Sequence, residues 1–505
     1  MAEIIMIQPN TSLTGAFVRM VPLGVLYASS RIIKETEIDL AILDLRIEPT
    51  EWQKNLIALK DDKTRIVGFS VMSGFSISES MTISRWIREN WPDVKIVWGG
   101  PHPTFSPDDV LAETFIDYVV QGYGRDSFFD LVQNIYNQPN AAPLESIPGI
   151  GWRDNGAIAK KNPPGTSFEF IDYQQIPYHL IEDYSVYRHI DDEVVFPIYS
   201  VMGCPYKCGF CSTPAQLRNF RKKWVPYDVE QVVGHIRFLH ENHGATYIYF
   251  IDEDSFVNLK HVEAIIEGVI AAGIDVKLGF RGARINEILK MDNRFLKMLV
   301  DAGTKSMHIG AECGSDRVLD LMEKNITVAD ILKANRILAG FPELRIFYNF
   351  IVGYPTETLE ETKETRDLIL KLMEENPSCF IIPLNKPRPL SNTSLLKLAL
   401  EHDYVEPKTL EEWGKYDVES SDYNPEWLSS KHNRFIRMMF LSMYFIDNKI
   451  DRLDHGKRGV FFWFLKQLAH IYRPIALFRF KHGIDSFLVE DWVYRFLNKI
   501  MPANP

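Results

Sequence analysis

The chain has 505 residues, which is too long for one ordinary hydrophobic core and predicts two or three domains. Hydrophobic residues make up 46% and charged residues 24% of the sequence, values typical of a globular protein, so a disordered chain is excluded. The net charge of −11 argues against a dedicated nucleic-acid-binding protein.

Residues 1–140 alternate short apolar runs with helical patterns. The runs EIIMIQP, DLAILDL, RIVGFSV, VKIVWGG and DYVVQG are mostly continuous, as in strands buried on both faces of a sheet. The pattern predicts an α/β, doubly wound, Rossmann-like domain. Ligands of such a domain bind outside the carboxyl ends of the parallel strands.

Residues 141–190 are rich in turn-forming residues and are predicted to be a linker with small hairpins. Residues 191–400 resume the alternation in six larger units, which predict a partial (βα)6 TIM-type barrel with its chemistry at the carboxyl ends of the strands.

Residues 401–505 are expected to be helical, with many aromatic and basic side chains. From Lys431 to Pro505 there are 13 Lys and Arg against 6 Asp and Glu, a local charge of +7 that leaves −18 on the rest of the chain. Two interpretations stay open, a helical cap over the barrel and a basic amphipathic surface that contacts anionic lipid.

The segment SVMGCPYKCGFCSTP, residues 200–214, holds three of the five cysteines: Cys204, Cys208 and Cys211. An odd number of cysteines with three clustered does not indicate a disulfide framework, so we expect a reducing, cytoplasmic location. The stretch MAEIIMIQPN has no basic region and no small-residue cleavage site, so no signal peptide is expected. Three thiolates on a Gly/Pro loop can hold one metal centre. Structural zinc usually takes four protein ligands, so a zinc site needs a distant histidine, whereas a four-iron cluster keeps one iron open to a ligand.

This CxxxCxxC spacing at the end of the first strand of the barrel, with Phe210 before the last cysteine, resembles the radical S-adenosylmethionine (radical SAM) enzymes. The resemblance implies a 4Fe-4S cluster on the three cysteines. It also implies that S-adenosylmethionine binds the open iron and is cleaved reductively to methionine and a 5′-deoxyadenosyl radical.

Further residues fit the S-adenosylmethionine site that the resemblance implies: Phe210, Asp252, Glu253, Asp254, Arg281, Glu312 and Gly353, with Arg284 as a second candidate for the cofactor carboxylate. The acidic residues 252–254 follow the second barrel strand, where the family accepts hydrogen bonds from the cofactor's ammonium group. Which carboxylate does this is left open, and a helix N-cap cluster is an equal alternative. Cys313 and Cys379 are interpreted as buried apolar residues.

The N-terminal domain, with its turns QPNTSLTG, SVMSGFS, GGPHPT and QGYGR after successive strands, resembles the cobalamin-binding domain of one radical SAM subgroup. The predicted cobalamin-binding residues are Asn10, Ser70, Ser73, Gly99, Gly100, Pro101, His102, Gly122 and Gly124. His102 is expected to be a turn residue and not a cobalt ligand, because the Asp-x-His-x-x-Gly motif is absent. The alternative is a Rossmann-like domain without a ligand.

The function expected from these features is methylation of an unactivated carbon in a hydrophobic metabolite, a lipid or tetrapyrrole, by way of methylcobalamin. The alternative is an anaerobic oxidative cyclase acting on a tetrapyrrole or related substrate, and a further one is a non-catalytic metal-binding protein. The expected partners are a small-molecule substrate and an electron donor such as flavodoxin or ferredoxin, with no nucleic acid. Peripheral contact with the inner membrane face through the C-terminal region is a further expectation.

Overall fold

The computed structural model describes residues 2–10, 20–47, 49–154, 158–187, 193–382, 384–415, 423–447, 460–486, 488 and 490–492. The N-terminal domain is built on a sheet of strands in the order β2-β1-β3-β4-β5-β6-β7. Their bounds are β1 Ile4–Gln8, β2 Leu40–Asp44, β3 Ile66–Ser70, β4 Lys95–Gly99, β5 Tyr118–Val120, β6 Ile150–Asp154 and β7 Ile158–Lys161. Strands β1 to β5 are parallel, as the continuous apolar runs predict.

Helices cover both faces of this sheet. Their bounds are α1 Leu23–Glu35, α2 Trp52–Leu59, α3 Phe75–Asn90, α4 Pro101–Phe105, α5 Pro107–Ala112 and α6 Arg125–Ile135. Helices α1 and α6 share one apolar core with the sheet, and α2, α3 and α5 share the other. Side chains of adjacent residues in β1 supply both cores: Ile4 points to the first and Ile5 to the second, and both are fully buried.

The hairpin β6–β7 lies in the segment for which the sequence predicts a linker. It pairs antiparallel with β5 through Tyr118 opposite Trp152 and so lengthens the N-terminal sheet. Short 3-10 turns, η1 Pro49–Glu51, η2 Leu144–Ser146, η3 Tyr173–Gln175, η4 Tyr178–Leu180 and η5 Tyr184–Tyr187, lie in the connections.

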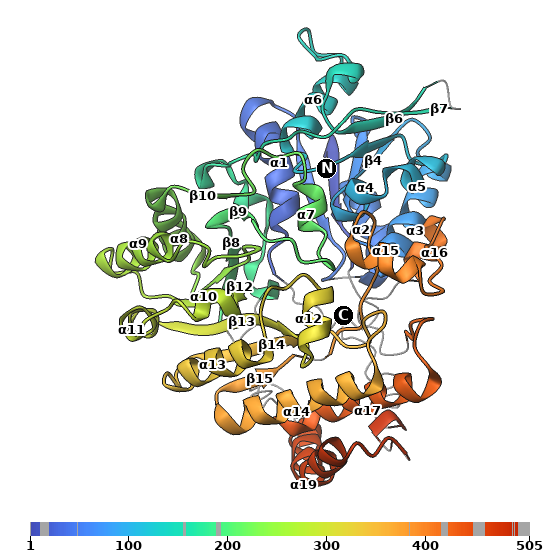
Figure 1. Cartoon of the computed structure of the whole chain (residues 1–505). Coiled ribbons are helices and arrows are strands. Elements are labelled where there is room, and N and C mark those ends of the chain that lie inside the picture. Colours follow the sequence, from blue (N-terminus) through green and yellow to red (C-terminus); the bar gives the residue numbers. More distant parts are fainter. Residues whose placement is uncertain are drawn as a thin grey trace.

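The second domain is an open barrel below this sheet (Figure 1). Its parallel strands have the order β15-β14-β13-β12-β11-β8. Their bounds are β8 Val195–Ile198, β11 Tyr247–Phe250, β12 Lys277–Arg284, β13 Thr304–Glu312, β14 Arg345–Phe350 and β15 Cys379–Ile381. The outer helices are α8 Val229–His243, α9 Leu259–Ala271, α11 Asn293–Asp301, α13 Val328–Ala339 and α14 Leu359–Glu375. Each begins at a side-chain cap, namely Asp228, Asn258, Asp292, Thr327 and Thr358.

Smaller elements lie at the carboxyl ends of the barrel strands: β9 Val201–Gly203, α7 Thr213–Gln216, β10 Trp224–Pro226, α10 Ile285–Ile288 and α12 Asp316–Leu321. The C-terminal region contains α15 Ser394–Leu400, α16 Leu410–Gly414, α17 Ser430–Ile446 and α19 Val460–His482. Helix α16 packs on α3 of the first domain, while α17 packs on α14 and α19. Among the described residues, no helix is both long and apolar enough to span a bilayer.

Candidate active site

The three clustered cysteines lie on the loop between β9 and α7. The loop starts at Gly203, whose φ is +80°, and a Cβ there would lie 2.4 Å from the carbonyl oxygen of Lys223. A residue with a side chain is therefore strained and crowded at this position. Cys208 is buried and Cys204 and Cys211 are half-buried. Burial raises the pKa of Cys204 to about 12 and also raises the pKa of Cys211.

Cationic side chains surround this loop. Arg284, 7% exposed, donates one hydrogen bond of 2.8 Å to Cys208 Sγ and another of 2.9 Å to the carbonyl oxygen of Lys324. Its guanidinium lies 3.9 Å from the ring centre of Tyr206. Positive charge beside the thiols favours their deprotonated, metal-binding form. The residues present therefore fit an anionic, thiolate-bound cluster.

In the described part of the chain, no three Cys, His, Asp or Glu side chains are placed to hold a single metal ion. A four-iron cluster needs a wider arrangement, because each cysteine binds a different iron atom. Cys204 and Cys211 are near enough to each other to raise the pKa of Cys204, as Cys208 raises that of Cys211.

The acidic residues after β11 have three different environments. Asp252 is buried and accepts hydrogen bonds from Ser200 N (2.8 Å), Ser200 Oγ (2.6 Å), Val201 N (3.1 Å) and Ser255 Oγ (2.9 Å), so it ties β11 to the loop after β8. Asp254 is also buried, and burial together with Glu287 raises its pKa well above the usual range. The N-cap of α9 is Asn258, so the cluster does not cap that helix.

Glu253 is the carboxylate that opens to the cavity described below. Its Oε2 accepts a hydrogen bond of 3.2 Å from Gly203 N, at the start of the cysteine loop. Desolvation by the surrounding protein raises the pKa of Glu253, while Arg281 acts in the opposite direction. Glu253 therefore lies between the cysteine loop, Arg281 and the first domain.

The other predicted residues are placed as follows. Glu312, at the end of β13 with φ +68°, forms a buried ion pair with Lys324 at 2.6 Å. The ammonium group of Lys324 lies 5.8 Å from the ring centre of Phe210. Gly353, with φ +84°, begins the turn after β14 and donates to Glu357 Oε2 at 2.7 Å.

A band of aromatic rings crosses the sheet beside Arg281. The ring centre of His308 lies 5.9 Å from that of Tyr249 and 4.8 Å from that of Phe347, which is 5.4 Å from Phe380. Register pairing of β13 with β14 and of β14 with β15 brings the last three residues side by side. Burial, assisted by Arg281, lowers the pKa of His308 to about 4, so its imidazole is neutral near pH 7.

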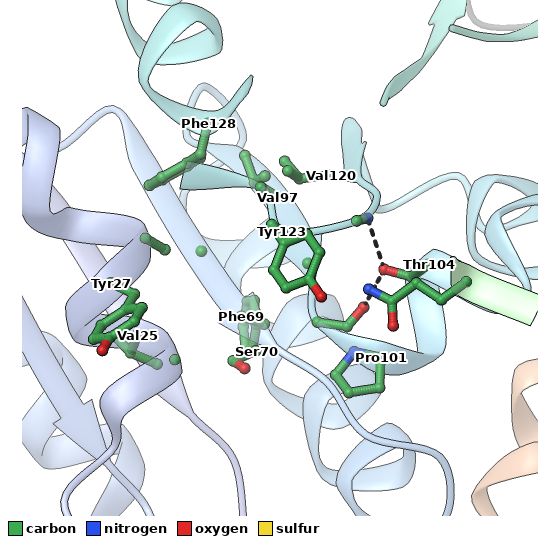
Figure 2. A pocket seen from close by; sticks show the side chains of 18 of the residues that line it. Val25, Tyr27, Phe69, Ser70, Val97, Pro101, Thr104, Val120, Tyr123 and Phe128 are labelled. Carbon is green, nitrogen blue, oxygen red and sulfur yellow. Dashed lines mark hydrogen bonds between the residues drawn. The ribbon is translucent and has the colours of Figure 1, made fainter. Parts of the chain in front are cut away.

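A cavity of about 330 Å³ lies between the two domains. Figure 2 shows residues of the first domain that line it. Its first wall is apolar and comes from the sheet with α1 and α6, through Met6, Val97 and Phe128. Its second wall comes from the barrel side, through Tyr199, Met202 and Glu253. Tyr27 and Tyr199 face each other with ring centres 6.0 Å apart. A mostly apolar slot whose lining includes the rings of Tyr27 and Tyr199 fits part of a large planar cofactor.

The cradle at this cavity depends on small residues. Gly100 has φ +98°, and a Cβ there would lie 2.8 Å from Val71 N. Thr104 Oγ1 accepts from Gly122 N at 3.0 Å and donates to the carbonyl oxygen of Gly100 at 2.8 Å, which joins two of the predicted turns (Figure 2). Six predicted cobalamin residues line the cavity: Ser70, Gly99, Gly100, Pro101, Gly122 and Gly124.

Three predicted cobalamin residues lie away from the cavity lining. Asn10 N donates to Glu79 Oε2 at 2.6 Å. His102 is buried, its Nδ1 is 3.0 Å from Ser73 Oγ, and its ring centre lies 5.5 Å from that of Trp413. His102 belongs to the short helix α4 and not to a simple turn.

Several cavity and loop residues were not predicted from the sequence, among them Tyr27, Phe128, Tyr199, Met202 and Lys324. Tyr27 and Phe128 lie on helices whose apolar periodicity is explained equally well by core packing. Lys324 follows α12 in a segment that reads as an ordinary charged turn. The sequence carries no separate signal for these contacts.

The comparisons with known proteins match both domains of the chain. Residues 198–369 match the radical SAM superfamily and residues 16–132 match the B12 binding domain. The chain is 26% identical over 426 residues to the uncharacterized methyltransferase PH0819 of Pyrococcus horikoshii, with 84% of this chain and 87% of that protein covered. It is 28% identical over 374 residues to the anaerobic magnesium-protoporphyrin IX monomethyl ester cyclase of Cereibacter sphaeroides, covering 72% of this chain and 59% of the cyclase.

Among solved structures, the cobalamin-dependent S-adenosylmethionine radical enzyme OxsB, with aqua-cobalamin and S-adenosylmethionine bound, shares the fold. The TM-score is 0.69 at 17% sequence identity, over 99% of this chain and 75% of that one. The radical SAM match makes this chain a radical SAM enzyme, and the likeness to OxsB is one of fold alone. This chain carries, in addition, a B12-binding domain ahead of its radical SAM domain. The two domain matches confirm the predicted fold class. They also imply a 4Fe-4S cluster, S-adenosylmethionine and cobalamin, which are the predicted cofactors.

Proposed function

We propose that this enzyme transfers a methyl group to an unactivated carbon of a hydrophobic small molecule. The relation to the methyltransferase PH0819 over 84% of the chain supports methyl transfer. When bound, the cluster and S-adenosylmethionine supply a radical that removes a substrate hydrogen, and cobalamin supplies the methyl group. The observation that carries the proposal is Glu253, which contacts the cysteine loop and also lines the interdomain cavity.

The side chains present have distinct tasks in this proposal. Cys204, Cys208 and Cys211 hold the cluster. Glu253 accepts hydrogen bonds from the ammonium group of S-adenosylmethionine, because Asp252 and Asp254 are buried while Glu253 is exposed. Arg281, also exposed, lies near Glu253 and binds the cofactor's carboxylate.

The remaining predicted residues complete both cofactor sites. Phe210 and Glu312 border the cluster and the ribose side, and the turn at Gly353 lies along the adenine. Ser70, Gly99, Gly100, Pro101, Gly122 and Gly124 hold cobalamin in the interdomain cavity, where the absence of side chains allows close approach of a ligand to the backbone. The two domains bring both cofactors to one interface, which would hold the reacting groups in position.

The substrate site in this proposal is the aromatic band Tyr249, His308, Phe347 and Phe380. Its neutral imidazole, the phenol ring of Tyr249 and two phenyl rings favour a hydrophobic, planar or polycyclic substrate. We further propose a cytoplasmic enzyme in peripheral contact with the membrane, where such substrates gather, and a flavodoxin or ferredoxin as electron donor.

An oxidative cyclase is the second candidate function. It is supported by the 28% identity with the Cereibacter sphaeroides cyclase over 72% of this chain. The cyclase uses the same predicted cofactor sites but forms no S-adenosylhomocysteine, because no methyl group leaves S-adenosylmethionine.

The test is anaerobic reconstitution with iron, sulfide and cobalamin, followed by incubation with S-adenosylmethionine and a strong reductant. Mass spectrometry should detect 5′-deoxyadenosine together with S-adenosylhomocysteine. Deoxyadenosine without S-adenosylhomocysteine would favour the cyclase, and absence of both would contradict both candidates. Glu253→Gln should weaken S-adenosylmethionine binding about tenfold, since a charge-assisted hydrogen bond contributes roughly 1.5–3 kcal/mol.

Two control variants, Cys313→Ser and Asp252→Asn, separate these effects from general damage to the protein. Cys208→Ser should lose the cluster, whereas Cys313→Ser should retain it, because Cys313 lies outside the loop and its Sγ is 3.4 Å from Thr365 Oγ1. Asp252→Asn, at the neighbouring carboxylate, should lower stability more than cofactor affinity. If Glu253→Gln binds S-adenosylmethionine as tightly as the wild type, the role of Glu253 is contradicted, while the proposed reaction is not.

A further inference from the structure

Helix α19 carries an apolar stripe on its solvent side, which we call the outer stripe. It consists of Trp463, Leu468, Ile471, Ile475 and Phe478, whose exposed fractions are 62%, 45%, 72%, 52% and 57%. The last four are three or four residues apart and therefore lie on one face of the helix. Figure 1 shows α19 at the end of the molecule opposite the N-terminal sheet.

The fold does not need the outer stripe for packing. Among the described side chains of α19, Ala469, Ala476 and Phe480 are buried, and the helix packs on α17 and α14. The helix is thus apolar on its inner face and again on its outer face. Single exposed apolar residues are ordinary, but a contiguous group of this size marks an interaction surface.

Basic residues flank the outer stripe. Lys481 and His482, the last two residues of α19, are exposed, and the ring of His482 lies 4.4 Å from that of Phe478, centre to centre. Residues 431–505 contain 13 Lys and Arg against 6 Asp and Glu, a local charge of +7 in a chain of net charge −11. Apolar and aromatic side chains with a basic flank match a surface that is hydrocarbon below and anionic above.

We propose that the outer stripe docks on an anionic phospholipid bilayer, with α19 lying along the membrane plane. A symmetric contact between two copies of the chain through this face would bring two basic flanks together, whereas anionic headgroups neutralise their charge. The outer stripe would be the surface that makes the membrane contact of the proposed function. Docking rests on the proposed function only for that role, because binding to a membrane requires no particular reaction.

The test uses the full chain and vesicles of equimolar phosphatidylcholine and phosphatidylglycerol in a flotation assay. The protein should float with the vesicles. The double variant Ile471→Ser/Ile475→Ser should bind about tenfold more weakly, because it removes two apolar side chains from the interface. Lys481→Glu should weaken binding to these vesicles and leave residual binding to pure phosphatidylcholine unchanged.

The matched control is Ile57→Ser/Val405→Ser, which removes apolar side chains of similar exposure, 55% and 73%, outside α19. It should float like the wild type.

Equal flotation of the stripe variant and the wild type would overturn the proposal, as would a wild type that stays with the soluble fraction. Loss of a dimer in the stripe variant without any flotation assigns the surface to a second copy instead. Equal binding to pure phosphatidylcholine overturns the role of the basic flank. Because the readout is binding, failure here leaves the reaction chemistry untouched.

Discussion

At the scale of single residues, Arg284 connects three parts of the candidate active site. One guanidinium contacts Cys208 Sγ, the carbonyl oxygen of Lys324 and the ring of Tyr206. Tyr206 in turn donates to Glu287 Oε1 at 2.7 Å. Hydrogen bonds to cluster sulfurs stabilise the more negative, reduced state and raise the reduction potential. Arg284 is therefore expected to set the ease with which the cluster accepts an electron.

Arg284→Met removes the donor while keeping a side chain of similar length. The midpoint potential of the cluster should fall by on the order of 50 mV, the size of a lost hydrogen bond of about 1 kcal/mol for a one-electron couple. Potentiometric titration followed by electron paramagnetic resonance measures this shift, with iron content as a check on loading. Arg281→Met is the matched control and should leave the potential near that of the wild type. Equal potentials in all three proteins would contradict the role of Arg284.

At the scale of elements, the turn between β14 and α14 is held by one buried carboxyl group. Glu357 Oε2 accepts from Gly353 N at 2.7 Å and Tyr354 N at 2.8 Å, and Oε1 accepts from Thr362 Oγ1 at 2.6 Å. Burial raises the pKa of Glu357 to about 7. His432, from α17, lies 2.6 Å from the same Thr362 hydroxyl, and burial lowers its pKa to about 4. His432 therefore stays neutral while Glu357 titrates.

Glu357 should make the protein less stable as pH rises. Below the ordinary glutamate pKa the group is protonated in both states and its contribution is fully present, and this contribution is lost as pH rises through about 7. Glu357→Gln cannot ionise; its amide oxygen can accept from both backbone N–H groups, and its amide nitrogen can donate to Thr362 Oγ1. At about pH 8 the variant should be the more stable protein by on the order of 2–3 kcal/mol, and at about pH 4 the two should be similar. Urea unfolding at both pH values measures this, and a pH-independent difference would refute it.

At the scale of the whole molecule, the segment after β15 joins the two domains. It returns to the first domain, where Leu410 and Trp413 enter the core beside α3. Trp413 Nε1 donates to Asp109 Oδ2 at 2.9 Å, and Ser391 Oγ lies 3.2 Å from Ser106 Oγ. Since the cavity has one wall in each domain, this segment helps to hold the two walls together.

Trp413→Ala should lower the free energy of unfolding by about 3–5 kcal/mol, because it empties a fully buried site and leaves Asp109 without the indole donor. Cobalamin retention should fall as the two cavity walls become less firmly held. Calorimetry and the cobalamin-to-protein ratio after gel filtration measure the two effects. Trp492→Ala, at a tryptophan that is 68% exposed, should change stability by only about 0.5 kcal/mol. A stable Trp413→Ala variant with full cobalamin retention would contradict the joining role.

The strands, the order of the two α/β domains and the cysteine loop followed from local patterns. Short apolar runs predicted β1 to β5 and the barrel strands, because burial on both faces depends on neighbouring residues along the chain. The spacing of Cys204, Cys208 and Cys211 is local as well. By itself, therefore, the sequence determined the fold class, and through the family resemblance the cofactors.

Contacts between distant residues were decided by the tertiary structure alone. Periodicity does not distinguish Asp252, Glu253 and Asp254. In the fold, Ser200 N donates a hydrogen bond to Asp252 and Gly203 N donates one to Glu253, each about 50 positions away along the chain. The docking of Trp413 beside Asp109 spans 304 positions, and the pairing of β6 with β5 turned an expected linker hairpin into part of the sheet. Such outcomes depend on how elements pack, and packing is a property of the assembled chain that no short window of sequence contains.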